Sequence, residues 1–95
     1  MSNITDIHRQ AIAYHDELNR RGYDPIRCPE LPVHEQRGRA ALCHVMWLCL
    51  DLSRFAPDPT SIEQEVDAMT QIAFIRGVLW SCGIVDLDGN LQAGL

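Results

Sequence analysis

The stretch that decides the fold is AALCHVMWLCL, from Ala40 to Leu50, in which His44 is the only plainly polar side chain. A second apolar block runs from Ile72 to Trp80. A helix that is apolar on nearly every side lies at the centre of a core or against another molecule. The stretch therefore predicts a helix buried on two faces, and it indicates association rather than chemistry.

Length and charge narrow the classes of protein. A chain of 95 residues suits a single domain with one hydrophobic core over residues 1–95. The formal net charge is −5, from 8 basic and 13 acidic residues, and every basic residue is Arg. Non-specific affinity for nucleic acid requires a basic surface. The charge balance therefore disfavours nucleic acid as a partner and favours a basic protein surface.

The sequence also predicts a compartment. The N-terminal segment is polar and lacks the apolar core of a secretory signal. The longest apolar run is shorter than the roughly 18 residues that span a bilayer. We therefore expect no membrane contact, a cytoplasmic location, and reduced thiols at all four cysteines, which are Cys28, Cys43, Cys49 and Cys82.

Apolar residues at helical spacing predict three helices, over about residues 3–21, 35–55 and 60–82. The stripe of the first helix is Ile4, Ile7, Ala11, Tyr14 and Leu18. The core stripe of the second is Ala41, Val45, Leu48, Leu52 and Phe55. The apolar set of the third includes Ile62, Val66, Met69, Ile72, Ala73, Ile75, Leu79 and Cys82. The predicted fold is an all-α three-helix bundle.

Turn and cap residues divide these helices. Three prolines within residues 23–33 predict an extended, proline-rich connector between the first two helices. Thr60 and Glu63 have the spacing of a capping box, which starts the third helix. Gly77 is unfavourable within a helix and is interpreted as a close helix crossing. The sequence Asp-Gly-Asn at 88–90 predicts a short C-terminal turn or hairpin.

The sequence lacks the patterns of a catalytic or metal site. Its histidines and cysteines have none of the short paired spacings that zinc sites use. Cys43 and His44 are neighbours on one helix, so their side chains diverge and cannot bond directly. We expect no enzyme activity, no catalytic residue, no metal and no cofactor. A thiol- or metal-dependent module built on Cys28 or on the Cys43 and His44 pair is an alternative left open.

A nucleic-acid function would depend on the one basic cluster of the chain. This cluster consists of Arg20, Arg21, Arg27, Arg37 and Arg39. A recognition helix must present Arg, Lys, Asn or Gln to the groove, and none of the predicted helices has such a face. A small DNA-binding regulator using this cluster is the alternative function.

The apolar excess predicts an interface. Three helices cover about one stripe each, whereas the second and third predicted helices have wider apolar arcs, and Trp and Met are enriched where proteins meet. The predicted interface residues are Met46, Trp47, Leu50, Phe74 and Trp80. The predicted charged contact surface is Asp58, Glu63, Glu65 and Asp67. These residues predict a homo-oligomer, as a homodimer, and a contact with another protein.

The stretch DAMTQIAFIRGVLWSCGI at 67–84, preceded by RAAL at 39–42 and MW at 46–47, resembles small proteins encoded by bacteriophages and prophages. In those proteins the corresponding stretch often reads Ala-Met, several residues, Gly-Phe, Gln-Gly, an apolar residue and Leu-Trp. This chain has Ala73 at the position of the first glycine and Arg76 at the position of the glutamine. Some phage proteins of similar size are anti-CRISPR or other host-takeover inhibitors, which act by binding a host protein. The resemblance implies a phage or mobile-element protein that binds and modulates a host protein, and it carries over no functional residue.

Overall fold

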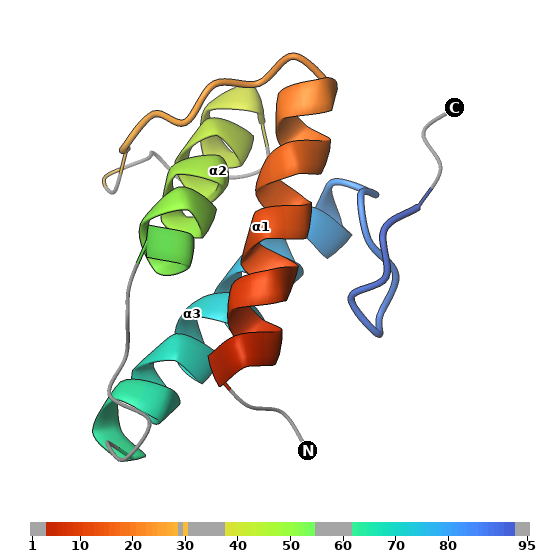
Figure 1. Cartoon of the computed structure of the whole chain (residues 1–95). Helices are drawn as coiled ribbons and strands as arrows, with labels where there is room; N and C mark the ends of the chain where they lie inside the picture. Colours follow the sequence, from red (N-terminus) through yellow and green to blue (C-terminus); the bar gives the residue numbers. More distant parts are fainter. Residues whose placement is uncertain (1–3, 29, 31–37, 55–61, 93–95) are drawn as a thin grey trace.

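The computed structural model is all-α, as the sequence predicts, and it describes residues 4–28, 30, 38–54 and 62–92. Its helices are α1 (Ile4–Arg20), α2 (Arg39–Arg54) and α3 (Ile62–Ser81) (Figure 1). Each helix contacts the other two, and α1 has its largest contact with α2. Among the described residues, none of the helices is long and apolar enough to cross a membrane.

α1 is amphipathic and buries one face. Four residues of its predicted stripe lie in the core and expose 2% of their surface or less, namely Ile7, Ala11, Tyr14 and Leu18, while the side chain of Ile4 is outside the described part. The helix ends in a Schellman motif, because Gly22 has a φ of 89° and the Tyr23 N–H donates to the Leu18 carbonyl at 3.0 Å. This bond turns the chain back, so that Tyr23 packs against the core.

α2 is the central helix, because its contacts with α1 and with α3 are both more extensive than the contact between α1 and α3. Its buried residues cover more than one face: Ala41, Leu42, Cys43, Val45, Met46, Cys49 and Leu52. Cys49 is fully buried, and burial raises the pKa of its thiol to about 12. Packing on two sides therefore accounts for most of the apolar excess of residues 40–50.

The described part of the second helix begins later than predicted. α2 begins at Arg39, after a bend at Gly38, and residues 35–37 of the predicted helix lie outside the described residues. The Gly38 carbonyl accepts the Leu42 N–H at 3.2 Å, so glycine stands in the capping position, where it costs little, instead of the helix interior. Leu48 from the predicted stripe is only partly buried, and Phe55 lies outside the described residues.

α3 buries one face through Ala68, Ile72, Ile75 and Leu79. It ends in a second Schellman motif, in which Gly83 has a φ of 75° and the Ile84 N–H donates to the Leu79 carbonyl at 2.9 Å. The interpretation of Gly77 as a close crossing is wrong, since no atom outside its own helix lies within 4 Å of its Cβ position. Thr60 of the expected capping box lies outside the described residues.

A compact turn follows α3. Val85 and Leu91 form an isolated antiparallel bridge, and residues between them fold around one carboxylate. Asp86 Oδ1 accepts the backbone N–H groups of Asp88 and Asn90, each at 2.9 Å. These bonds, above all the one from Asn90, lower the pKa of Asp86. The turn is therefore closed by its own side chain.

The turn is attached to the helices at Gly89. Tyr14 Oη donates to the Gly89 carbonyl at 2.7 Å, and Arg21 Nη2 donates to the Gln92 carbonyl at 3.0 Å. Gly89 has a φ of 82°, and a Cβ there would lie 2.9 Å from Tyr14 Oη and 3.1 Å from Arg76 Nε. Glycine is required at this position both by the backbone conformation and by the two side chains that enclose it.

Candidate interaction surface

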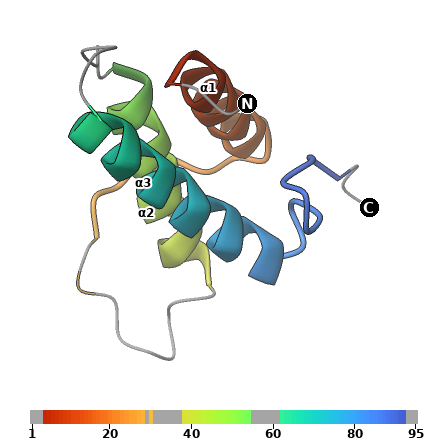
Figure 2. The same ribbon diagram turned by 90° about the horizontal axis from the view of Figure 1, so that it is seen from below.

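α3 has a second apolar face that the fold leaves uncovered. Viewed from below, α3 lies in front of α2, and no other described element covers its outer side (Figure 2). Large apolar side chains are exposed along α3 and in the turn after it: Ile62 by 77%, Val66 by 53%, Met69 by 44%, Phe74 by 54%, Trp80 by 53% and Leu87 by 84%. Exposed apolar surface of this extent is typical of sites of interaction.

Most of these side chains lie on one line along the helix. We name the α3 stripe by its six residues: Ile62, Val66, Met69, Ala73, Gly77 and Trp80. At about 100° per residue, they fall within roughly 80° of one another around the axis. The centre of the buried face, which includes Ile72 and Leu79, is roughly 100° away or more. α3 is therefore apolar on two distinct sides.

A hollow interrupts the α3 stripe near its C-terminal end. It has a volume of about 290 Å³ and is lined by Ala73, Arg76, Gly77, Trp80, Asp86 and Leu87. The lining residues from α3 include two small ones, Ala73 and Gly77. Asp86 and Leu87 come from the turn. The hollow is open at the surface and is apolar over most of its lining, so it can accept an apolar side chain.

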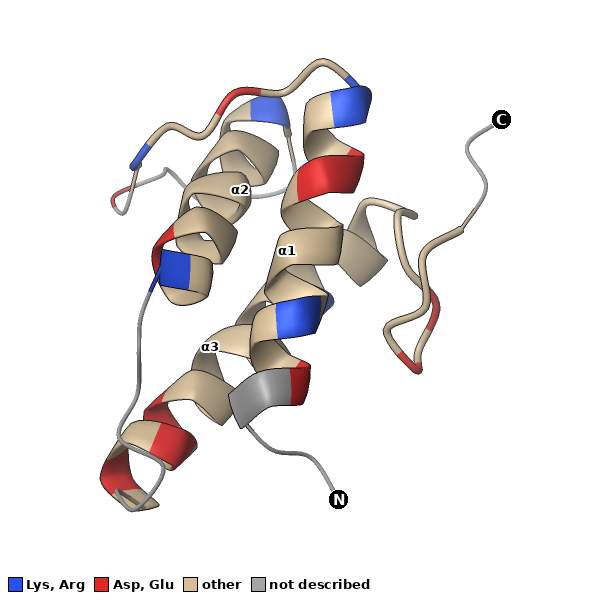
Figure 3. Ribbon diagram, viewed as in Figure 1, with Lys and Arg blue, Asp and Glu red and all other residues tan. Residues whose placement is uncertain are grey.

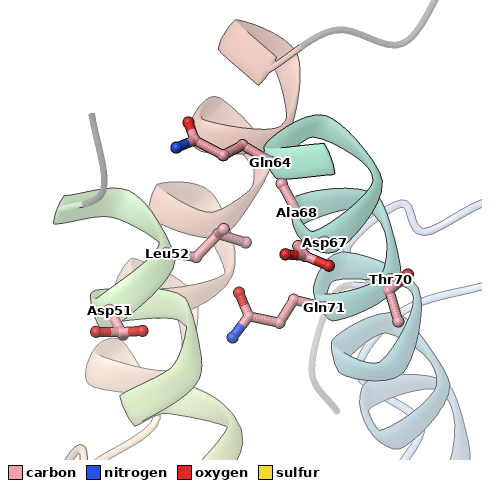
Figure 4. A pocket seen from close by; sticks show the side chains of 7 residues that line it. All are labelled: Asp51, Leu52, Gln64, Asp67, Ala68, Thr70 and Gln71. Atoms are coloured by element: carbon pink, nitrogen blue, oxygen red, sulfur yellow. The ribbon is translucent and has the colours of Figure 1, made fainter. Parts of the chain in front are cut away.

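A second depression, the α2–α3 groove, lies between these two helices. It has a volume of about 460 Å³, and Figure 4 shows the side chains that line it: Asp51, Leu52, Gln64, Asp67, Ala68, Thr70 and Gln71. Leu52 points from α2 toward α3, and Gln71 points from α3 toward α2 (Figure 4). Two carboxylates, two amides and a hydroxyl can together accept several hydrogen bonds from a guanidinium or ammonium group.

The predicted interface residues divide into three groups. The prediction of Met46 as an interface residue is corrected, because its side chain is only 1% exposed and belongs to the core between the helices. Its unbranched side chain fills the space that two-sided packing of α2 creates. Trp47 and Leu50 are partly buried. Phe74 and Trp80 are exposed, and Trp80 belongs to the α3 stripe.

The predicted acidic surface is partly visible. Figure 3 shows acidic residues in the first turns of α3 and again in the C-terminal turn. Glu63 and Asp67 are exposed, and Glu65 is partly buried. Of the predicted acidic residues, Asp67 is the one that lines the α2–α3 groove. Asp58 lies outside the described residues.

The arginine cluster is engaged within the chain. Arg20 and Arg21 both bond to Glu17, at the end where α1 ends and α2 begins (Figure 3). These hydrogen bonds, the one from Arg20 first, lower the pKa of Glu17 to about 2. Arg39 donates to the Gly22 carbonyl at 2.9 Å. The remaining member, Arg37, lies outside the described residues.

Arg39 and Arg27 also stack on aromatic rings. The Arg39 guanidinium lies 4.7 Å from the centre of the Tyr23 ring, and that of Arg27 lies 5.6 Å from Trp47. The contacts of Arg39 and Arg27 therefore fasten the described part of the connector to α2, whereas Arg20 and Arg21 pair with Glu17 of their own helix.

His44 bonds to the backbone of the residues that follow α1. His44 Nδ1 accepts the backbone N–H of Cys28 at 3.0 Å, and the imidazole stacks on Trp47 with ring centres 6.3 Å apart. Burial, together with the charge of Arg27, lowers the pKa of His44. Within the described residues the cysteines are free, and no group of three His, Cys, Asp or Glu side chains could hold a metal ion.

Sequence reasoning missed how the apolar residues of α3 are divided between faces. Ile62, Val66 and Met69 join the buried residues in one apolar set when only their hydrophobicity is counted. Their own spacing of four and three residues, continued by Ala73, is the signal that separates them. The α2–α3 groove was also missed, apart from Asp67, because its other wall comes from α2.

No protein-family model, curated protein or solved structure matches the chain. The chain's own surface is therefore the guide to its function.

Proposed function

We propose that this chain is a non-enzymatic protein-binding module that acts through α3. The observation that carries the proposal is the α3 stripe, an exposed apolar face along a helix whose opposite side already serves the core. Burying such a face against another protein removes apolar surface from water, which is the main favourable contribution to most protein association. The core uses only the buried face of α3, so the α3 stripe is available to a partner.

The proposed partner is a host protein, bound by a phage or mobile-element product in the cytoplasm of a bacterial host. The resemblance of residues 67–84 to phage proteins supports this context. Glu63 and Asp67 lie on one side of α3, and Asp67 lines the adjoining α2–α3 groove, which supports a partner with a basic surface; Glu65, the third predicted acidic residue of this helix, lies on the other flank. In this proposal, binding of the partner modulates its activity.

The proposal includes the finer parts of the expected architecture. An extended, proline-rich connector joins α1 and α2, and a hairpin follows α3. The bond from the Ile26 N–H to the Cys43 carbonyl, at 3.1 Å, supports the first. The bridge between Val85 and Leu91 supports the second.

Affinity capture from the host tests the function. The wild-type chain is expected to retain a host protein, and the double variant Glu63→Lys and Asp67→Lys is expected to retain at least tenfold less of it. Asp16→Lys, on an exposed position of α1, changes charge in the same direction and should leave capture intact. Capture that is equal for all three proteins would contradict the acidic contact surface.

A small DNA-binding regulator using the arginine cluster is the weaker proposal. What supports it is that the end of α1, with Arg20 and Arg21, lies beside the start of α2, where Arg39 bonds to the Gly22 carbonyl (Figure 3). Their intramolecular bonds and the net charge of −5 weigh against it. A mobility-shift assay decides it, since phosphate binding must weaken steeply with added salt.

A further inference from the structure

The hollow in the α3 stripe has the geometry that receives a side chain from another helix. Its helical lining, formed by Ala73, Arg76, Gly77 and Trp80, has the spacing i, i+3, i+4 and i+7. These are the positions that form one hole in knobs-into-holes packing. Because Ala73 and Gly77 are small, about 290 Å³ stays open above the helix backbone, beside the wall provided by Leu87.

The same stripe also supplies knobs. Its N-terminal half presents the bulky, exposed side chains of Ile62, Val66 and Met69, whereas its C-terminal half contains the small Ala73 and Gly77. Two copies of α3 paired in antiparallel orientation place Val66 and Met69 opposite the segment that contains the small Ala73 and Gly77. A parallel pair would place bulky against bulky and leave the hollows facing each other, which loses packing contacts.

We propose that the α3 stripe binds the α3 stripe of a second copy of this chain, antiparallel, with Val66 of each copy seated in the hollow of the other. With the two-fold axis beside Gln71, the centre of the hollow lies opposite Val66, and Ile62 lies opposite Trp80. The inference rests on the proposed protein-binding function and names the occupant of the α3 stripe.

The charges beside the stripe suit this arrangement. Glu65 and Arg76 lie on the same flank, roughly 20° apart around the helix. Two-fold symmetry makes that flank face its own copy, so Glu65 of each chain meets Arg76 of the other, twice per dimer. Arg76 is held in place by its Nη2 bond to Gln10 Oε1. The antiparallel pair also sets opposite ends of the two helix dipoles side by side.

The exposed area is sufficient for such a dimer. The large side chains of the α3 stripe, together with Leu87 of the following turn, each expose about half of their surface or more. Together they present on the order of 600 Å², the lower end of what each partner buries in a stable, specific interface. This area equals the upper end of the largest apolar patch, about 300 to 600 Å², on a typical monomer.

Sedimentation velocity at micromolar concentration tests the dimer. The wild-type chain is expected to sediment as a dimer. Val66→Asp, which removes the knob, and Gly77→Leu, which fills the hollow, should each raise the dimer dissociation constant at least tenfold. Both positions are exposed, so helix content by circular dichroism should stay unchanged. Ile12→Asp places the same charge on an exposed apolar position of α1 and should leave the dimer intact.

A monomeric wild type would overturn the proposal, and so would a dimer that tolerates both Val66→Asp and Gly77→Leu. Charge exchange tests the orientation. Glu65→Arg and Arg76→Glu should each weaken the dimer several-fold, and the double variant should recover most of the loss. Gln10→Ala, which removes only the internal partner of Arg76, should have a smaller effect. Absence of recovery in the double variant would overturn the antiparallel arrangement.

Host capture separates this inference from the proposed function. A monomeric wild type that still captures a host protein contradicts the dimer and leaves the function in place. A dimer without capture supports the inference and contradicts host binding. If the wild type is monomeric and Val66→Asp abolishes capture, the α3 stripe is the binding site of the host protein, and the second-copy proposal is overturned.

Discussion

α1 and α3 serve the core in the same way but differ in what they show to solvent. α1 buries one apolar stripe, and its outer side carries ion pairs such as Glu17 with Arg20 and Arg21. α3 buries an equally apolar stripe, and its outer side carries Ile, Val, Met and Trp side chains. A charged outer side is satisfied by water, whereas an apolar one gains free energy from a partner. The comparison therefore separates residues that make the fold from residues that serve association.

The largest difference in the free energy of unfolding should appear between alanine variants of Leu79 and Trp80, two neighbours on different faces of α3. Leu79 is 0% exposed, so Leu79→Ala should lower the free energy of unfolding by about 3 kcal/mol through the lost burial and the cavity left behind. Trp80→Ala removes a larger side chain from the exposed face and should change it by less than about 0.5 kcal/mol. Urea denaturation in a Val66→Asp background excludes self-association. Equal losses for both variants would show that the outer side of α3 belongs to the core.

The next effect concerns Gly89, which lies between α1 and α3. Gly89→Ala should destabilise the fold by about 2 kcal/mol, because a Cβ at positive φ is strained and would displace the Tyr14 hydroxyl from its hydrogen bond. Thermal unfolding measures the loss, and Tyr14→Phe reports the hydrogen-bond part alone, at about 1 kcal/mol. A Gly89→Ala variant as stable as the wild type would mean that the turn is not held against Tyr14.

Gly77→Ala should have a smaller effect of opposite sign. Gly77 faces open space and has no close neighbour, so alanine should stabilise α3 by roughly 0.5 to 1 kcal/mol through its higher helix propensity. The measurement again uses the Val66→Asp background. A loss of stability would indicate that another part of the chain packs over the hollow.

The smallest effect should come from the charged side of α1. The pKa of Glu17 is about 2 in the fold, below its ordinary value of 4.5, so the ionised carboxylate stabilises the folded state. That contribution is complete above about pH 5 and is lost as the pH falls toward 2. Because Arg20 is 65% exposed, we expect only about 0.5 kcal/mol. Glu17→Gln should remove this amount at neutral pH, and it should flatten the acid branch of the stability profile relative to Asp16→Asn.

The number and type of the helices could be predicted because local patterns determine them. The spacing of Ile7, Ala11, Tyr14 and Leu18 predicts one buried face of a helix, and the structure confirms that face. Both Schellman motifs contain a glycine, Gly22 or Gly83, that comes directly after the apolar pattern of the helix. The start of α2 could not be placed from the pattern, because Gly38 is followed and preceded by residues that a helix tolerates equally well.

The candidate surface was harder to predict, since burial depends on how neighbouring helices are placed. Met46 and Trp80 have similar hydrophobic character, yet Met46 lies where α2 meets its neighbours and Trp80 lies on the outer side of α3. Hydrophobicity alone cannot distinguish them. The α2–α3 groove depends on Asp51 approaching Gln64 and Asp67 from another helix, and no pattern within either segment encodes that approach.

The turn after α3 forms part of the hollow, and its local opening determines how long the hollow stays intact. Leu87 provides one wall, and the turn that carries it is attached to α1 through single hydrogen bonds from Tyr14 and Arg21. Segments with few attachments open locally far more often than packed helices. Amide protons of residues 86–92 should therefore exchange with solvent faster than those of α3. The rate of that opening sets how often an occupant of the hollow can enter or leave.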